Sequence, residues 1–307
     1  MIRLICALIL LLLIIGCGED EQSPPIIFSL TANPKIVSPS EASTITVEAG
    51  DPDKDKLLYQ WTAENGKIIG EGKTIKWESP DKEGKYEITV TVSDGINSVN
   101  KKIYLRVWTP RPGDYYPLAV GNKWVYKDKK DNIITFEVID TIDISGTKVF
   151  VKRTTTSNIE DATNYSYISK GKDIINQHAV GGSSAGDDTL IFTPILPLYK
   201  FPLIPDESWD IEFQVNVPDG FFVGNGKAIY KVLSEEDITV KAGTFKHVFQ
   251  VEEDFVWEIF GQQLDHTISK QWLAPNVGII KFINEQTRGG ETFITEAELE
   301  SYLIKEN

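Results

Sequence analysis

Apolar and polar residues alternate with a period of two in short runs along the chain. In the first third, four runs carry their apolar residues at every second position: Ile45, Val47 and Ala49; Leu57, Tyr59, Trp61 and Ala63; Tyr86, Ile88, Val90 and Val92; Ile103, Leu105 and Val107. Such runs, separated by turn residues, indicate antiparallel strands that are buried on one face. The pattern predicts a β-sandwich over residues 26–108.

The same alternation continues after a short linker at residues 109–114, which contains Pro110 and Pro112. It predicts strands at 123–127, 133–140, 148–155, 164–169, 173–178, 209–215, 228–233, 245–251, 254–260, 265–272, 277–284 and 291–304. No window carries the 3.6-residue period of an amphipathic helix. We therefore expect an all-β chain, in which residues 115–307 form a curved antiparallel sheet or half-barrel.

The first domain resembles a known family. Trp61 lies where immunoglobulin-like sandwiches carry their strand-C tryptophan, and Tyr86 lies where they carry the tyrosine of the tyrosine corner. The stretch Asp51-Pro52-Asp53-Lys54-Asp55, followed by Ile88-Thr89-Val90-Thr91-Val92-Ser93-Asp94-Gly95, resembles the polycystic-kidney-disease (PKD) type of immunoglobulin-like domain. That resemblance implies a spacer or adhesion module without catalysis.

The acidic turn at residues 51–55 has the alternate spacing of calcium ligands. An EF-hand is excluded, because Lys56 occupies the place of its glycine and Thr62 that of its bidentate glutamate. In an immunoglobulin-like sandwich the loop of Asp94 lies at the same end as Asp51, Asp53 and Asp55. These four carboxylates are therefore candidate calcium ligands, and the alternative is a solvated turn.

The N-terminus has the form of an export signal. Arg3 precedes an unbroken apolar run from Leu4 to Ile15, which is shorter than the roughly 20 residues of a membrane-spanning helix. Ile14-Ile15-Gly16-Cys17 resembles the lipobox of bacterial lipoproteins, which implies a signal peptide over residues 1–16 and acyl chains such as palmitate on Cys17. A polar tether over residues 17–25 follows, and Gly18 favours the outer over the inner membrane of the cell envelope by resemblance to Gram-negative sorting rules.

Composition supports export and excludes one class of partner. The other cysteine, Cys6, lies inside the apolar run, so the processed chain would hold no disulfide. The chain of 307 residues has 31 basic and 45 acidic residues, a net charge of -14. A nucleic acid partner requires a basic footprint, and the sequence has none. The expected partners are the membrane, through lipidated Cys17, and an envelope protein or apolar ligand.

The second domain carries a weaker resemblance. Ala242-Gly243-Thr244-Phe245 and Trp272-Leu273-Ala274-Pro275-Asn276-Val277-Gly278 resemble a pattern of uncharacterised envelope lipoproteins, which are similar in architecture to the half-barrel carriers of the Lol pathway. The carriers close their concave face with helices, and this sequence predicts none. The resemblance therefore implies a fold more than a carrier activity.

The candidate catalytic motifs lack the context that their chemistry needs. Gly182-Ser183-Ser184-Ala185-Gly186 matches the G-x-S-x-G nucleophile elbow, but no helix follows it, and we interpret it as a chance match. His178, His247 and His266 lie in different predicted strands without a zinc spacing. Glu252 and Glu253 are adjacent, so they point to opposite faces of a strand and cannot act as a pair. We predict neither a catalytic residue nor an enzyme cofactor.

Two apolar segments remain as candidate contact sites. Residues 193–205 carry four prolines, which predicts an extended strap across an apolar surface, with Leu198 and Phe201 as contacts, instead of a central strand. Phe221 and Phe222 lie between turn signals, where an exposed pair would mark a contact site and a buried pair would close the end of the domain. The favoured hypothesis is a non-catalytic, lipid-anchored scaffold or binding protein. The alternatives are a carrier of lipid or another apolar ligand, and then a hydrolase.

Overall fold

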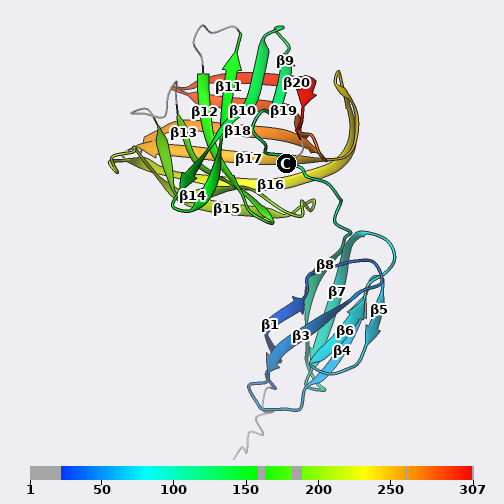
Figure 1. The fold of residues 1–307 in the computed structure, drawn as a ribbon. Helices are drawn as coiled ribbons and strands as arrows, with labels where there is room; N and C mark the ends of the chain where they lie inside the picture. Colours follow the sequence, from blue (N-terminus) through cyan, green and yellow to red (C-terminus); the bar gives the residue numbers. More distant parts are fainter. Residues whose placement is uncertain (1–21, 158–162, 182–188, 260–261, 306–307) are drawn as a thin grey trace, which may run out of the picture. The chain divides into compact units, whose positions relative to one another are not determined.

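The computed structural model describes residues 22–157, 163–181, 189–259 and 262–305. It divides into two compact units, residues 1–109 and 110–307 (Figure 1). Every regular element of the described residues is a β-strand, which confirms the all-β prediction. Among these residues, no helix is long and apolar enough to span a membrane.

The first unit is a sandwich of two four-stranded sheets, with strand orders β1-β3-β6-β5 and β2-β8-β7-β4. The strands are β1 (Ile26–Asn33), β2 (Ile36–Val37), β3 (Ala42–Gly50), β4 (Leu58–Ala63), β5 (Lys67–Ile69), β6 (Thr74–Glu78), β7 (Gly84–Ser93) and β8 (Ser98–Val107). Apart from the short parallel pair of β2 and β8, the ladders are antiparallel. The predicted immunoglobulin-like sandwich is confirmed.

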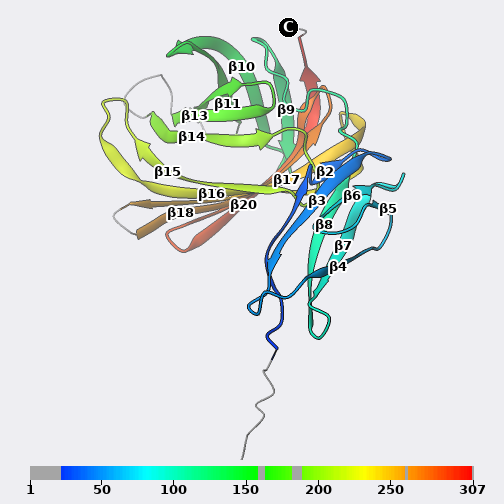
Figure 2. The same ribbon diagram turned by 90° about the horizontal axis from the view of Figure 1, so that it is seen from below.

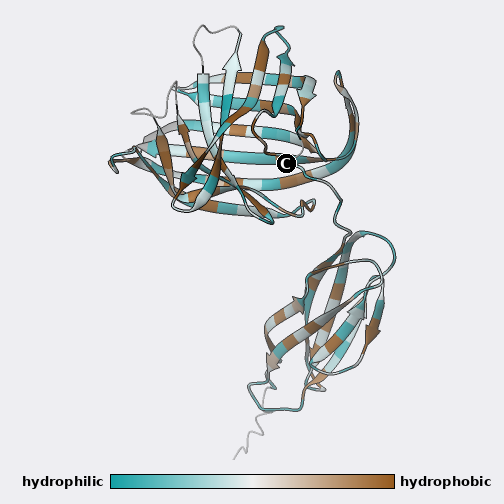
Figure 3. Ribbon diagram, viewed as in Figure 1, coloured by the Kyte–Doolittle hydropathy of each residue, from teal (hydrophilic) through white to brown (hydrophobic). Residues whose placement is uncertain are grey.

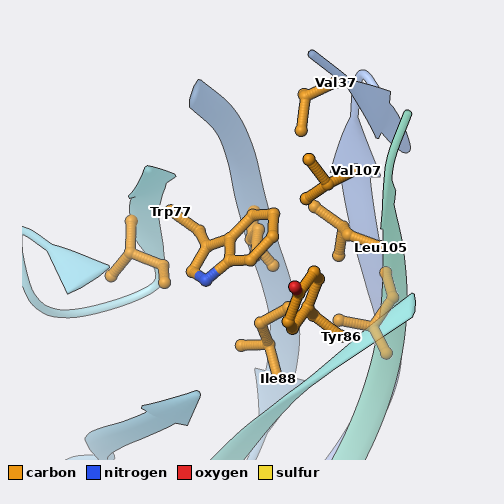
Figure 4. Close-up of a cluster of buried hydrophobic side chains, with 9 residues drawn as sticks. Val37, Trp77, Tyr86, Ile88, Leu105 and Val107 are labelled. Atoms are coloured by element: carbon orange, nitrogen blue, oxygen red, sulfur yellow. The ribbon is translucent and has the colours of Figure 1, made fainter. Parts of the chain in front are cut away.

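The core of the sandwich is mainly apolar, because every second residue of β3, β6, β7 and β8 points between the sheets. Trp77 lies in the cluster of buried side chains that Figure 4 shows, and it is completely buried. Its indole N–H donates to the carbonyl oxygen of Asn65 at 2.8 Å. The Tyr86 hydroxyl donates to the carbonyl oxygen of Lys82 at 2.7 Å, which is the contact of a tyrosine corner. Trp61 on β4 packs against this core only partly buried.

The second unit is a closed antiparallel barrel of twelve strands, β9 to β20 in sequence order, in which β9 also pairs with β20. The strands are β9 (Lys123–Asp128), β10 (Ile133–Ile144), β11 (Thr147–Thr156), β12 (Thr163–Lys170), β13 (Ile174–Gly181), β14 (Leu190–Lys200), β15 (Ser208–Asn216), β16 (Phe222–Val240), β17 (Gly243–Ile259), β18 (Gln262–Ala274), β19 (Gly278–Arg288) and β20 (Glu291–Leu303). The predicted curved sheet thus closes on itself. Figure 2 shows β10–β14 arching opposite the wall of β16, β17 and β18.

Long strands and β-bulges give the sheet its curvature. β16 and β17 form the longest hairpin, and their register shifts twice, between Val232 and Ser234 and between Glu236 and Ile238. A bulge adds one residue on one side of a ladder and bends the strand locally. β17 also joins two segments that the sequence predicts as separate strands. Hydrophobic and hydrophilic residues alternate along most barrel strands, as Figure 3 shows, so that two faces are distinct.

The prediction for residues 193–205 was wrong in one respect, because their first half is a barrel strand. β14 contains Pro194 and Pro197, yet it pairs with β13 along most of its length and with β15 over residues 191–193. The register against β13 shifts twice, and the ladder with β15 ends before Pro194. A proline lacks an N–H group, so it is tolerated where a bulge or a missing ladder removes the need for that donor.

Candidate functional site

One end of the barrel interior is filled by aromatic rings. Phe192 on β14 lies 6.5 Å from Phe255 on β17, although two strands separate them in the sheet, and Phe213 packs against both rings. Strands lie about 4.8 Å apart, so this contact must cross the interior of the curved sheet. A side chain at Gly226 would place its Cβ 2.2 Å from the ring of Phe213, and glycine is therefore needed there.

A segment that precedes the first barrel strand fills another part of the interior. Residues 115–119 are buried, and the Tyr116 ring lies 5.2 Å from that of Tyr199 on β14. The Tyr115 hydroxyl donates to the carbonyl oxygen of His247, and burial together with Glu235 raises the pKa of Tyr115 to about 12. We call residues 115–119 the plug segment. It makes the chain next to the linker part of the barrel core.

A polar cavity of about 100 Å³ lies within the barrel. The residues that line it come from seven strands and the plug segment: Tyr116, Lys152, Ser166, Ile168, Gln177, Leu198, Tyr199, Tyr230, Val251, Glu253 and Gln271. A wall drawn from so many strands places the cavity inside the closed sheet. Burying an ionisable group costs free energy unless charged or hydrogen-bonding partners compensate it, so Lys152 and Glu253 need such partners in this cavity.

Three groups dominate the electrostatics of the polar cavity. Burial raises the pKa of Glu253, and this effect is only partly offset by Tyr230 and by the Lys152 ammonium group. Burial also raises the pKa of Tyr230, whose side chain is 1% exposed. The Tyr230 hydroxyl interacts with the Glu253 carboxylate, which lowers the pKa of Glu253 and raises that of Tyr230. Lys152 Nζ lies 3.3 Å from the Tyr116 hydroxyl and 4.9 Å from the centre of the Phe136 ring.

A chain of hydrogen bonds leads from the polar cavity along the inner face of β18 and β19. The Tyr199 hydroxyl donates to the side-chain oxygen of Gln271, and burial holds the pKa of Tyr199 well above its ordinary value. Gln271 donates to Ser269 at 3.2 Å, and Ser269 in turn donates to Asn284 at 2.7 Å. Because these partners satisfy one another, the network stiffens this wall of the barrel.

An open, mainly apolar groove of about 490 Å³ lies beside the aromatic end, apart from the polar cavity. We call it the outer groove, and its lining is Ile142, Ile144, Tyr167, His178, Ala179, Thr189, Ile191, Phe192, Ile195 and Pro218. Ile195 is 41% exposed, and Ile142 and Ile144 are exposed at the edge of the groove. Burial lowers the pKa of His178, so the neutral imidazole is favoured there. The groove offers contact to an apolar molecule.

The structure separates the predicted contact residues. Leu198 lies partly buried between the aromatic end and the polar cavity. Phe201 lines a different, open pocket near Lys170, while Phe221 and Phe222 are exposed at the turn that leads into β16. The four residues do not form one site. Cys17, the predicted lipid anchor, lies outside the described residues.

The candidate calcium ligands serve mainly as turn acceptors. Asp51 Oδ1 accepts the backbone N–H groups of Asp53 and Asp55, and Asp53 Oδ2 accepts that of Ser23. Desolvation opposes ionisation of Asp94, yet the backbone N–H groups of Ile96 and Asn97 lower its pKa.

Asp51 and Asp94 each leave their second oxygen buried without a partner. Within the described part of the chain, no three side chains from His, Cys, Asp and Glu gather as a metal-binding group. The calcium site stays a prediction.

The candidate catalytic residues are also dispersed. The G-x-S-x-G match at residues 182–186 lies outside the described residues. His178 contacts the hydroxyl of Ser169 at 2.7 Å, His247 pairs with Glu235 and His266 pairs with Asp254, on three different strands. Each histidine therefore has its own local partner, and the structure does not bring them together.

Sequence reasoning missed the polar cavity, although a signal was present. On β17, Glu253 lies two positions from each of the apolar residues Val251 and Phe255. Since every second residue of a strand points to the same face, this alternation already places the Glu253 carboxylate on the inner face. Glu252 points outward to Lys270 at 3.4 Å, as expected for adjacent residues on a strand. Lys152 and Tyr230 could not be found in this way, since no local pattern relates them to Glu253.

The first unit can be identified by comparison. Its two sheets and tyrosine corner match what the motifs at residues 51–55 and 88–95 imply. Residues 27–107 match the family model of the PKD domain. The predicted resemblance is confirmed, and we refer to this unit as the PKD-like domain.

Comparison of the whole chain with solved structures finds low similarity. A "putative exported protein with YmcC-like fold" from Bacteroides fragilis is 13% identical, with a TM-score of 0.38, and the match covers 62% of this chain and 100% of that one. A "putative lipoprotein" from Parabacteroides distasonis is 14% identical, with a TM-score of 0.34, over 63% of this chain and 100% of that one. No curated protein matches the sequence. The role of the barrel must therefore be argued from its own residues.

Proposed function

We propose that this chain is an exported, lipid-anchored protein of the cell envelope with a non-catalytic scaffold or binding role. The apolar run at residues 4–15 and the cysteine that follows Gly16 support export and acylation of Cys17. Two or three acyl chains would give stable anchoring, where one chain gives only reversible binding. The PKD-like domain then spaces the barrel from the membrane, and Gly18 favours the outer membrane.

The observation that carries the scaffold role is the filled interior of the barrel. Sites for small organic ligands usually have volumes of about 300–1,000 Å³. The polar cavity has about 100 Å³, and a second interior cavity beside Tyr126 and Phe136 has about 20 Å³. The aromatic end and the plug segment fill further parts of the interior. A barrel packed in this way supports a rigid body that presents its outer surface to a partner.

One observation favours a carrier of an apolar ligand as the second candidate. The outer groove has about 490 Å³ and is lined mainly by isoleucine, alanine and aromatic side chains. This volume is sufficient for part of an acyl chain. In this alternative the ligand would bind in the outer groove, in contrast to a half-barrel carrier, whose concave face holds the ligand.

The anchor is tested by comparing two cysteine variants of the full chain. We expect Cys17→Ser to abolish acylation and to move the protein out of the membrane fraction. Cys6→Ser is the matched control, because Cys6 lies in the predicted signal peptide and is removed with it. Intact-mass measurement and fractionation report both effects. A wild-type protein whose Cys17 carries no acyl chain would contradict the proposal.

Two isoleucine variants distinguish the scaffold function from the carrier function. Ile195 and Ile229 are both 41% exposed, but only Ile195 lines the outer groove. We expect mass spectrometry to detect no lipid that co-purifies with the wild-type protein. If a lipid is present and Ile195→Asp loses it while Ile229→Asp retains it, the carrier replaces the scaffold as the preferred function.

A further inference from the structure

The sheet of the barrel opens between β14 and β15. Their ladder ends where Thr193 pairs with Gln214, and within the described chain residues 208–213 of β15 pair with β16 alone. An open cleft of about 630 Å³ lies at this point, with Thr193 and Pro194 on one side and residues 212–214 on the other. We call it the β15 cleft. A strand that lacks a neighbour on one side presents backbone groups with which another chain can pair.

The register shows which backbone groups of β15 face the cleft. The Val232 N–H donates to the carbonyl oxygen of Glu207 at 2.9 Å, so the odd-numbered residues of β15 exchange their hydrogen bonds with β16. The even-numbered residues therefore direct their N–H and C=O groups toward β14. Gln214 uses these groups to pair with Thr193, whereas the ladder has already ended at Asp210 and Glu212.

The two sides of the β15 cleft differ in how their edges are protected. On β14, Pro194 and Pro197 lack N–H groups, and the Pro197 carbonyl oxygen accepts the indole N–H of Trp209 at 2.6 Å. Proline and lysine are common protections of a sheet edge, and residues 208–213 contain neither. The edge of β14 is therefore blocked, while that of β15 is open to a further strand.

The charges beside the cleft indicate what such a strand must carry. The side chains of Asp210 and Glu212 are exposed on β15. Lys227 pairs with Asp210 at 3.7 Å, but Glu212 and Glu258 have no ion-pair partner among the described residues that line the cleft. Cross-strand neighbours share a face of the sheet, and opposite charges there are favourable. An added strand should therefore carry lysine or arginine at every second position.

The inner side of the sheet limits the residues between these basic positions. Leu196 and Leu198 of β14 pack with Trp209 and Ile211 of β15 on the inner face. Close-packed interiors leave little room for further side chains. The inward residues of an added strand should therefore be small, such as alanine, serine or threonine.

We propose that the β15 cleft binds an extended segment of a partner protein, which adds to β15 as a strand and carries basic residues alternating with small ones. This inference rests on the proposed scaffold function, because it names the kind of partner that the barrel presents its surface to. A second copy of this chain could pair through the same edge, and a basic peptide could be held by charge alone. The experiment distinguishes these occupants.

The probe is a short capped peptide in which lysine and threonine alternate, titrated with the full chain and followed by fluorescence anisotropy. We expect saturable binding. Glu212→Lys should weaken the affinity about tenfold, because a favourable cross-strand pair becomes a repulsive one. Glu285→Lys is the matched control, since Glu285 is exposed on β19 and the net charge changes equally. It should bind the peptide like the wild type.

Hydrogen exchange, measured for each residue by NMR on the wild type, shows how the peptide is held. Strand addition should slow the exchange of the Asp210 and Glu212 N–H groups, which face the cleft. The Ile211 N–H, which bonds to β16, should be protected with and without the peptide. This measurement also decides the matter if Glu212→Lys does not fold.

Four results would overturn the proposal: no saturable binding, equal losses of affinity in Glu212→Lys and Glu285→Lys, binding without new protection of Asp210 and Glu212, or protection that rises with protein concentration in the absence of peptide. The third result would indicate charge alone, and the last a second copy of this chain. Acylation of Cys17 and co-purifying lipid, which test the proposed function, are separate measurements. A failure there is therefore distinguishable from a failure of the β15 cleft.

Discussion

The two domains have the same kind of secondary structure but differ in what they enclose. Between the sheets of the PKD-like domain lie Trp77, Ile88 and their apolar neighbours, packed around a tyrosine whose hydroxyl is satisfied. Inside the barrel, a layer with Lys152 and Glu253 lies against aromatic packing. Alternation of apolar and polar residues therefore does not guarantee a uniformly apolar interior.

The difference follows from the geometry of closure. Two sheets of a sandwich face each other across about 10 Å, so inward side chains from both sheets meet in the middle. The diameter of a barrel grows with the number of its strands, and side chains just fill the interior at about eight strands. A barrel of twelve strands needs further material, here the plug segment and long polar side chains.

The largest loss of stability should come from a substitution in the core of the PKD-like domain. Trp77→Ala removes a completely buried indole and should lower the free energy of unfolding of the PKD-like domain by about 3–5 kcal/mol. Urea denaturation followed by circular dichroism measures this loss. Ile69→Ala is the control, because Ile69 is 44% exposed, and should change stability by less than about 0.5 kcal/mol. Similar losses for both variants would contradict the assigned core.

Substitution of two leucines on β14 compares the aromatic end with the polar cavity within one strand of the barrel. Leu196 is 1% exposed in the aromatic end, and Leu196→Ala should cost about 2–5 kcal/mol. Leu198 is only partly buried and lines the polar cavity, so Leu198→Ala should cost about half as much. Urea denaturation of both variants gives the ratio. A near-neutral Leu198→Ala that also alters uptake of an apolar fluorescent probe would favour a gated carrier.

A third test uses pH to separate the inner from the outer face of β17. Because burial raises the pKa of Glu253, the folded state retains its proton to higher pH than the unfolded chain. Glu253 therefore contributes most to the free energy of unfolding at pH values below its pKa in the unfolded chain. This contribution is lost as the pH rises through its pKa in the folded state. Glu253→Gln, which resembles the protonated form, should gain stability relative to the wild type as pH rises from about 4.5 toward neutrality.

The matched control for this pH test is Glu252→Gln. Glu252 is the neighbouring residue on the outer face, where it pairs with Lys270. Thermal melts of both variants across the pH range report the difference. Identical pH profiles for the two variants would show that Glu253 does not experience a polar cavity.

The smallest expected effect concerns calcium and the acidic turns of the PKD-like domain. We expect no change in melting temperature with calcium, because the carboxylates already accept backbone N–H groups. A site with a Kd of roughly 0.5 mM would instead give about 1.4 kcal/mol at ~5 mM calcium. A shift of several degrees that Asp51→Asn abolishes would establish the calcium site.

Local sequence patterns predicted most strands of the barrel but not the roles of individual residues on them. Period-two alternation located most of them, since it records which face of a strand is buried. It missed β14, because Pro194 and Pro197 normally exclude a central strand, and only the pairing with β13 and the gap toward β15 explain their place. The candidate contact residues were also predicted from short sequence segments alone, and the fold places Leu198 and Phe221 in unrelated surroundings.

The sequence by itself determined the all-β class, the location of most barrel strands and the PKD-like character of the first domain. These properties depend on neighbouring residues, through the pleat of a strand and the residues of a turn. Only the tertiary structure decided that twelve strands close into a barrel and that Lys152, Tyr230 and Glu253 share one cavity. These residues come from strands far apart in the chain, and their meeting depends on the curvature and register of the entire sheet.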